Sequence, residues 1–327
     1  ASIIFQLLSS FYKPLIILKK EDVIGYEKTE LYIRYLSFFL SILQAIGICL
    51  FVSIPLIKHD FFYYILSVTS LVTGAMIVLW LCENINNYGI GNGVSIIIFS
   101  GILSTFFPTI INVFEKIRIG EISYFTFFSL FFIFFFLLIV ILFFEQSYYK
   151  ISVNFLNKQV GSKIYAAQRS FLPLKINVSG VISPMFATSF LLFPAMLLQL
   201  FVFSDNFMLK FFSKILTTYV YPGSFFFVFF NVFLIFFFCF LYAKIIFNVK
   251  DVSDNLKKNG GFIIGYRPGS QTTFFLSFII ERLTVIGSLY IAFVVTVFDC
   301  LSFFLNVSFF LGGTGLMIVI VVRLDLL

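Results

Sequence analysis

The chain has 327 residues, of which 61% are apolar and only 11% are charged, and this composition excludes a soluble globular protein. The mean hydropathy of +1.07 is typical of a protein that crosses a membrane several times, because a bilayer permits apolar surface on every side of a helix. The net charge of +7 therefore reports mainly how the loops are divided between the two sides of that membrane.

Apolar runs of about 20 residues predict the membrane-spanning helices. Along the chain they cover Tyr32–Ile54, Phe61–Leu81, Asn92–Val113, Ile122–Phe144, Gly180–Phe203, Ser224–Phe247, Phe274–Val297 and Phe304–Val322. The shorter run Ala1–Leu18 has the pattern expected for the end of another helix. We predict an all-α polytopic membrane protein with roughly eight full transmembrane helices plus the end of a ninth, since the runs have helical length and lack the alternation of an outer-membrane barrel.

Lysine and arginine concentrate in alternate loops, and the positive-inside rule assigns those loops to the cytoplasm. The cytoplasmic segments are then Glu83–Gly93, residues 145–178 and residues 248–273. The opposite side carries few basic residues, namely Lys58, Lys116, Arg118, Lys210 and Lys214. Most of the charge pattern therefore predicts orientation and indicates no ligand.

The segment Tyr88–Phe99 has three glycines in alternate positions. This spacing disfavours a regular helix and permits a tight turn with positive φ, after which Asn92 or Ser95 can cap the next helix. A dinucleotide site is excluded, because the spacing, the preceding buried strand and the downstream acidic residue are all missing.

A basic loop from Lys163 to Asn177 leads into a span that contains Pro184 near its start. A proline there can kink the helix or leave a backbone carbonyl unbonded, which suits a mobile gate. A proline that is merely tolerated in a membrane helix is the alternative interpretation.

The longest polar segment is Phe247–Thr273, between two apolar spans. Asp and Lys at helical spacing predict an exposed helical turn, followed by a glycine-rich loop with Arg267 at its tip. A polar loop of this length between membrane spans usually contacts something outside the membrane.

In order along the chain, these motifs resemble those of the SecY family, whose members are the channel subunits of the general secretory translocon. Asp254–Lys258, Arg267–Gly269 and Gln271–Thr272 are similar to the large cytosolic loop before the family's ninth helix. Tyr88–Phe99 resembles the start of the fifth helix, and Lys163–Ala187 resembles the second large cytosolic loop and the start of the seventh. Further matching strings are Ser67–Gly74, Arg282–Tyr290 and Gly312–Gly315, so the resemblance covers essentially all 327 residues.

The resemblance implies a clamshell of two halves. Residues 1–117 would be the remainder of the N-terminal half, from the end of helix two to helix five. Residues 118–327 would be the C-terminal half, helices six to ten, with cytosolic loops at 145–178 and 248–273. Because Ala1–Leu8 matches the middle of helix two, the sequence lacks helix one, the plug segment and the start of helix two. We expect that the sequence is a fragment of a longer protein, and a decayed natural protein is the alternative.

The resemblance also implies a channel that passes unfolded secretory polypeptides across the cytoplasmic membrane and membrane segments laterally into it. Matching the motifs places Ile98, Met185 and Ile318 in an apolar ring at the waist of the pore. Such a ring dewets when it is empty and lets any side chain slide past. Met185 replaces the usual isoleucine with a flexible thioether that can still form a seal. Outside this register each residue would be expected to face lipid or a helix core.

Arg267 matches the arginine with which the family engages the ribosome or the SecA motor. The implied basic face around it also includes Lys257, Lys258, Lys158 and Lys163. SecE-like and SecG-like membrane subunits are the other implied partners, together with the translocating polypeptide, its signal sequence and membrane lipid.

The family's lateral gate runs between helices two and seven, with helix three nearby. Gln6 and Gln44 are polar residues inside apolar segments, which is costly in lipid and predicts inward-facing or gate positions. A hydrogen bond between helices without a gating role is the alternative for both.

A secondary transporter of a small solute is the second hypothesis, since broken helices at Gly89–Gly93 and Pro184 would suit one. Transporters usually carry mid-membrane charges, whereas Glu281 and Arg282 are adjacent and of opposite sign. An intramembrane enzyme is a third hypothesis, and it lacks support because no aspartate falls in a predicted span and His59 is isolated. The scattered cysteines show no metal-ligand spacing, so we expect no metal site. The sequence also has no P-loop, no HExxH motif, no nucleophile–base pair and no paired intramembrane carboxylates, so we expect no enzyme activity and no cofactor.

Overall fold

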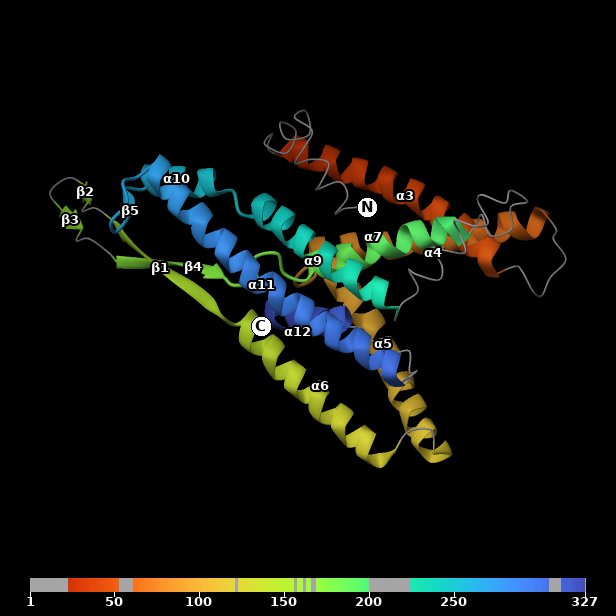
Figure 1. The fold of residues 1–327 in the computed structure, drawn as a ribbon. Helices are drawn as coiled ribbons and strands as arrows, with labels where there is room; N and C mark the ends of the chain where they lie inside the picture. Colours follow the sequence, from red (N-terminus) through yellow and green to blue (C-terminus); the bar gives the residue numbers. More distant parts are fainter. Residues whose placement is uncertain are drawn as a thin grey trace. The chain divides into compact units, whose positions relative to one another are not determined.

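The computed structural model describes residues 23–52, 61–120, 123–155, 158–160, 163–165, 169–199, 224–305 and 313–326. The chain divides into two compact units. Within the described ranges, the first unit contains α3 (Val23–Val52), α4 (Phe61–Tyr88), the start of α5 (Gly93–Ile119) and the end of α7 (Ile182–Gln199). The second contains the described parts of 98–191 and 219–327 (Figure 1).

The second unit holds most of the helices. Besides the larger part of α5 and the first part of α7, these are α6 (Tyr124–Glu145), α9 (Phe225–Ile246), α10 (Val249–Lys258), α11 (Ser270–Leu305) and α12 (Gly313–Leu326). Across the described ranges, the helices long and apolar enough to span a membrane are α3, α4, α5, α6, α9 and α11. The described parts of α7 and α12 are shorter and also apolar. The prediction of a helical polytopic membrane fold is confirmed.

In the first unit, α3 packs along α4 and a bidentate ion pair joins them. Arg34 donates two hydrogen bonds, of 2.7 and 2.8 Å, to the two carboxylate oxygens of Glu83. The paired geometry matches each cation donor to an oxygen, so neither charge stands alone within an apolar helix.

The glycine-rich turn between α4 and α5 has the conformation expected from its sequence. Gly91 has a φ of 80°, and the side-chain oxygen of Asn92 accepts a hydrogen bond of 3.1 Å from the Val94 N–H. A Cβ on Gly93 would overlap the carbonyl oxygen of Cys82. The predicted turn with positive φ and an Asn92 cap is therefore confirmed.

In the second unit, α9 and α11 pack side by side (Figure 1). The buried face of α9 recurs at helical spacing and includes Asn231, Ile235, Phe238, Cys239 and Tyr242. Because α9 is apolar on nearly every side, its sequence does not show which face is covered.

A three-stranded antiparallel sheet extends from the helices of the second unit, in the order β4 (Arg169–Lys175), β1 (Tyr148–Phe155), β5 (Gly261–Ile263). Ile151 pairs with Leu172, and Asn154 pairs with Phe262. A separate hairpin joins β2 (Lys158–Val160) to β3 (Lys163–Tyr165). These strands, which lie within the two polar segments, were not predicted from the sequence.

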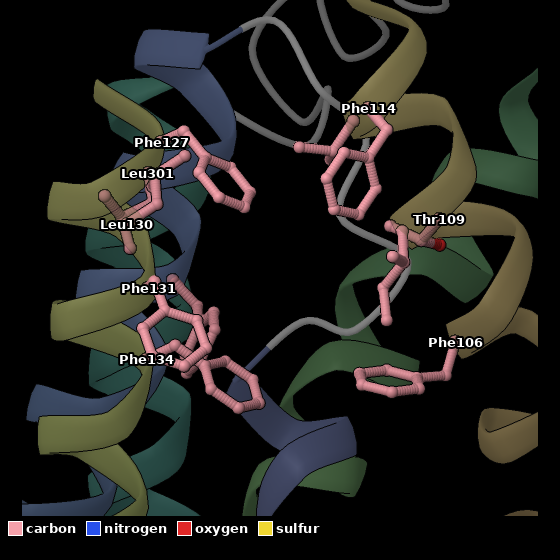
Figure 2. A pocket seen from close by; sticks show the side chains of 11 residues that line it. Phe106, Thr109, Phe114, Phe127, Leu130, Phe131, Phe134 and Leu301 are labelled. Atoms are coloured by element: carbon pink, nitrogen blue, oxygen red, sulfur yellow. The ribbon is translucent and has the colours of Figure 1, made fainter. Parts of the chain in front are cut away.

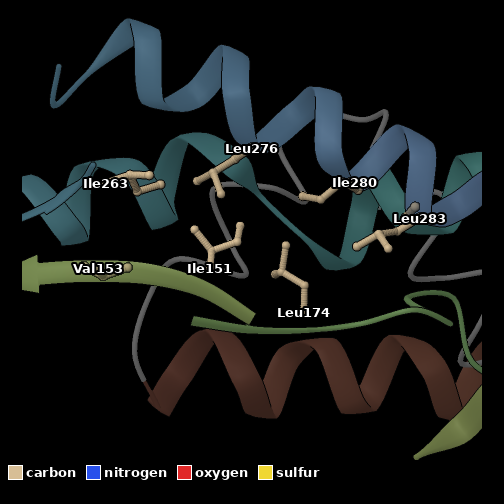
Figure 3. Packing of buried hydrophobic residues seen from close by; sticks show 8 residues of the cluster. Ile151, Val153, Leu174, Ile263, Leu276, Ile280 and Leu283 are labelled. Atoms are coloured by element: carbon tan, nitrogen blue, oxygen red, sulfur yellow. The ribbon is translucent and has the colours of Figure 1, made fainter. Parts of the chain in front are cut away.

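One face of the sheet is buried against the start of α11. Ile151 and Leu174 point from their strands toward that helix (Figure 3). On α11 they meet a stripe of side chains at helical spacing, namely Leu276, Ile280 and Leu283. Full burial of each such side chain contributes about 1.5–3 kcal/mol, so this cluster fixes the sheet on the helix.

The close approach of α12 to α11 depends on Gly313. A Cβ there would lie 2.8 Å from the Val295 Cα and 2.9 Å from the Val294 carbonyl oxygen. Gly313→Ala should push α12 away and lower the free energy of unfolding by about 2 kcal/mol. The matched control Gly101→Ala lies on α5 where nothing is within 4 Å, and it should not destabilise. Equal melting temperatures of the two detergent-solubilised variants would contradict this prediction.

Candidate functional site

The predicted pore-ring residues all belong to the second unit. Ile98 lies in the second turn of α5 and Met185 lies near the start of α7, and both side chains are half-buried. Ile318 is buried on α12, with 7% of its surface exposed. The described structure thus places three apolar side chains on three helices of one unit.

One contact brings α5 and α12 together close to two of these residues. The Ile102 side chain lies 3.8 Å from the position of a Cβ on Gly315, so the absence of a side chain there permits the approach. Ile98 and Ile318 are each about one helical turn from this contact. The geometry is compatible with a shared ring, which stays a prediction.

Pro184 lies inside the first turn of α7 and is fully buried. A helix start leaves its first N–H groups unbonded in any case, so the N–H that proline lacks is not missed there. The Met185 N–H donates a hydrogen bond of 3.4 Å to the Val181 carbonyl. Pro184 therefore belongs to the start of α7 and does not interrupt the helix.

Arg267 is presented by a loop with a fixed backbone. Gly265 and Gly269 flank it with φ values of 88° and 112°, a region that favours glycine. The Arg267 N–H donates to the Gln271 side-chain oxygen at 3.2 Å, and its carbonyl accepts from the Thr272 hydroxyl at 2.9 Å. Its side chain is exposed, so the loop is ordered while the cation faces outward.

The same loop is anchored on two helices. The Tyr266 ring stacks on the Phe275 ring of α11, with the centroids 4.1 Å apart. From α10, the Ser253 hydroxyl donates a hydrogen bond of 3.1 Å to the Gly269 carbonyl. These contacts hold Arg267 in a defined position relative to the core of the second unit.

Lys257 and Lys258 are exposed in the last turn of α10, where cations interact favourably with the helix dipole. On the opposite face of α10, Val252 and Leu256 pack against the core cluster. The predicted exposed turn is thus a complete amphipathic helix. Lys158 and Lys163 lie in β2 and β3, and their side chains are outside the described residues.

The pairing of β1 with β5 joins the two predicted docking segments into one structure. Val153, in the first segment, pairs with Ile263, in the second. A Cβ on Gly261 would lie 2.9 Å from the Phe155 ring, so glycine permits this close pairing. The two basic loops, about 100 residues apart in sequence, therefore form one body.

The structure tests little of the predicted gate. Gln44 is exposed on α3 of the first unit. Gln6 lies outside the described residues. The assignment of both side chains to a gate stays a prediction.

Described residues of the second unit line two cavities between its helices. The first, of about 290 Å³, is bounded by α5, α6 and α11, and Figure 2 shows Phe106, Thr109 and Phe114 facing Phe127 and Phe131 across it. Among the described residues that line it, Thr109 alone is polar, and its hydroxyl donates to the Thr105 carbonyl at 2.8 Å. This cavity offers no group for ion coordination or acid–base chemistry.

The second cavity, of about 470 Å³, lies between α5, α6 and α12. Its lining is apolar apart from Gln146 and Arg323. Within the described ranges, no three His, Cys, Asp or Glu side chains come together where they could hold a metal ion.

Asp299 corrects one expectation of the sequence analysis. The predicted span ended at Val297, but α11 continues to Leu305 and includes this aspartate. Asn231 of α9 donates a hydrogen bond of 3.5 Å to its carboxylate. The helix extends beyond the predicted end of the span because Asp299, at which the apolar run ended, has a hydrogen-bond partner on another helix.

A buried polar cluster just before α7 was also not predicted from the sequence. Glu145 accepts hydrogen bonds from Asn177 at 2.6 Å and from Tyr290 at 3.4 Å. The partners are 32 and 145 residues away along the chain, so no local spacing signals the cluster.

The described structure defines a class of protein: a multi-span helical membrane protein with the fold of protein-conducting channels. A solved structure of a protein conducting channel matches with a TM-score of 0.67 and 15% sequence identity, covering 99% of this chain and 77% of that one. A structure showing the plug domain of the SecY protein, which stabilises the closed state of the translocation channel, matches with a TM-score of 0.68 and 15% identity, covering 99% and 78%.

The family model for SecY matches residues 1–327. The protein translocase subunit SecY of Buchnera aphidicola (subspecies Acyrthosiphon pisum) is 41% identical over 99% of this chain and 75% of its own length. SecY of Escherichia coli K12 is 38% identical over 99% and 74%, and that of Rickettsia conorii is 39% identical over 99% and 76%. The chain belongs to the SecY family, as the motifs predicted.

Proposed function

We propose that this chain is the protein-conducting channel subunit of a Sec translocase, which passes unfolded secretory polypeptides across the cytoplasmic membrane and membrane segments laterally into it. The observation that carries the proposal is the family match over residues 1–327, which depends on no single motif. The channel fold of the structural relatives supports it independently of sequence identity.

In this proposal residues 1–117 belong to the N-terminal half of a clamshell and residues 118–327 to the C-terminal half. The two halves would move relative to each other. They are not the same as the two compact units of the structure, which are defined by packing contacts. The loops at 145–178 and 248–273 face the cytoplasm, in keeping with their basic residues.

Ile98, Met185 and Ile318 contribute to the waist of the pore. An apolar constriction excludes ions by dewetting when it is empty and binds no passing side chain. The half-burial of Ile98 and Met185 supports this role, because each keeps part of its surface accessible within the described structure.

SecE-like and SecG-like subunits complete the complex in this proposal, and a ribosome or the SecA motor docks on the cytosolic face. The docking residues are Arg267, Lys257, Lys258, Lys158 and Lys163. The ordered loop around Arg267 supports the assignment, since a backbone that is already fixed lowers the entropic cost of docking. Gln6 and Gln44 are the proposed gate residues.

The chain itself performs no catalysis in this proposal, and a partner motor or translation supplies the energy. A secondary transporter would require a polar substrate site within the membrane. The lining of the two cavities of the second unit, which is apolar apart from Thr109, Gln146 and Arg323, disfavours that alternative.

Transport of a secretory polypeptide tests the proposed function. The protein should be expressed from its intact gene with its small membrane subunits and placed in vesicles with SecA and ATP. We expect a secretory precursor to become protected from added protease, while the same precursor without its signal sequence stays accessible. Uptake of a small solute driven by an ion gradient, without protection of any precursor, would favour the transporter instead.

A further inference from the structure

The end of α6 and the start of α7 are held together by a buried hydrogen-bond cluster. The Asn177 amide donates to the Glu145 carboxylate at 2.6 Å, and the Tyr290 hydroxyl donates to the same oxygen at 3.4 Å. The exposed fractions of the three residues are 7% for Glu145, 3% for Asn177 and 4% for Tyr290. Removing one partner would leave a buried polar group unsatisfied, which is costlier than losing an exposed hydrogen bond.

Aromatic and backbone contacts fix the same point from α11. The rings of Phe144 and Tyr290 stack with centroids 4.6 Å apart, which orients the tyrosine hydroxyl. A Cβ on Gly287 would lie 3.0 Å from the Ile176 carbonyl oxygen, so the segment that leads to α7 lies directly against α11.

The first turn of α7 is tied to α9 by a second group of buried side chains. The Cys239 thiol donates to the Ser183 hydroxyl oxygen at 3.1 Å, and the hydroxyls of Ser179 and Ser183 lie 3.2 Å apart. Ser179 in turn donates to the Asn177 side-chain oxygen at 3.3 Å. The two groups therefore form a continuous chain from Glu145 to Ser183, two residues before Met185.

The cluster also continues directly into the cytosolic sheet. The last pair of the β1–β4 ladder is Tyr148 with Lys175, and the next backbone hydrogen bond runs from the Ile176 N–H to the Ser147 carbonyl at 3.3 Å. The next residue after Ile176 is Asn177, whose side chain makes the hydrogen bond to Glu145. Hydrogen bonds that follow one another along the chain thus connect the sheet with the segment that leads into α7.

We propose that Glu145, with Asn177 and Tyr290, is a positioning site that holds the start of α7 in place and couples the cytosolic sheet to Met185. This inference rests on the proposed function, in which Met185 belongs to the pore ring. The cluster contacts no transported chain, and it acts by setting the position of a residue that does. Breaking it should loosen the closed ring and let ions leak through the empty channel.

The test uses vesicles containing the complete complex and compares Asn177→Leu and Glu145→Leu with Glu145→Gln. The leucine variants remove a polar group at similar volume, whereas glutamine keeps an oxygen that accepts from Asn177 and Tyr290. We expect the leucine variants to raise ion leak at least about tenfold, the factor expected when a buried polar partner is left without a hydrogen bond. Glu145→Gln and the control Glu281→Leu, at an exposed glutamate of α11, should leak like the wild type.

Hydrogen exchange separates positioning from general destabilisation. Exchange should rise over residues 176–188 in the leucine variants and stay unchanged in α9 and the rest of α11. Tyr290→Phe keeps the ring stack and removes only the longer bond, so it should give the same pattern with a smaller leak. This variant also serves as the test if the leucine variants do not accumulate.

Wild-type leak and exchange in Asn177→Leu, or in Tyr290→Phe where the leucine variants are lost, would overturn the proposal. Faster exchange throughout the second unit would also overturn it, because the cluster would then act only in overall stability. Failure of the wild-type complex to transport a precursor would contradict the proposed function instead, and the exchange pattern would still show whether the cluster positions α7.

Discussion

Replacing Arg267 with glutamate should reduce polypeptide transport at least about tenfold while the protein stays folded, since charge complementarity changes association rates by 10-fold or more. The Arg267 side chain is exposed, and the hydrogen bonds that order its loop come from the backbone and survive the change. Protease protection of a secretory precursor in vesicles measures the effect. Raising the salt concentration should weaken transport by the wild type and narrow the difference.

Arg169→Glu is the matched control for this prediction. Arg169 is an exposed arginine on β4, in the same sheet-containing body, and its replacement changes the net charge equally. It should retain most of the transport. An equal loss of transport in Arg267→Glu and Arg169→Glu would show that only the net charge matters for transport and that the ordered loop around Arg267 has no specific role.

Asparagine in place of Met185 or Ile98 should make the empty channel leak ions about tenfold faster than the wild type. An apolar ring excludes ions because water leaves it, and one amide that binds water removes much of that barrier. Electrical conductance of single complexes, or release of a trapped anion from vesicles, measures the leak. Precursor transport should continue, since a wider and wetter ring still admits a polypeptide.

Leu103→Asn provides the control on α5, because Leu103 is exposed and lies outside the proposed ring. It should leave the leak unchanged. A leak in this variant as large as that of Ile98→Asn would mean that any polar residue on α5 disturbs the membrane seal, and the assignment of the ring would fail.

The composition of the chain predicts that its helices cross a membrane, but it does not predict the residues at which each helix begins and ends. The predicted span Phe274–Val297 lies within α11, which runs from Ser270 to Leu305. Hydropathy ended the span at polar residues, yet Thr272 donates to the Arg267 carbonyl and Asp299 accepts from Asn231. Polar residues with such partners continue a helix that an apolar scan ends.

The three-stranded sheet was not predicted, although part of its signal is present in the sequence. Ile151, Val153 and Phe155 alternate with polar residues, as expected for a half-buried strand. The third strand, Gly261–Ile263, has three residues and no recognisable period. Its pairing with β1 depends on the folded helices, and so does the bond between Glu145 and Asn177. The family motifs assign single residues to helices. They do not show which distant residues contact each other, so the pairing of β1 with β5 and the bond between Glu145 and Asn177 could be seen only in the structure.

The sheet has a consequence for the order in which the protein is made. Strand β5 follows β1 by about 100 residues, so a growing chain completes β1 and β4 long before their third strand and α11 exist. During that interval Ile151 and Leu174 lack the cover of Leu276, against which they pack in the folded protein. A nascent chain halted before residue 261 therefore carries an apolar strand pair that a chaperone can bind and that is ready to aggregate. This stage ends when α11 has emerged and Leu276 packs on the two strands.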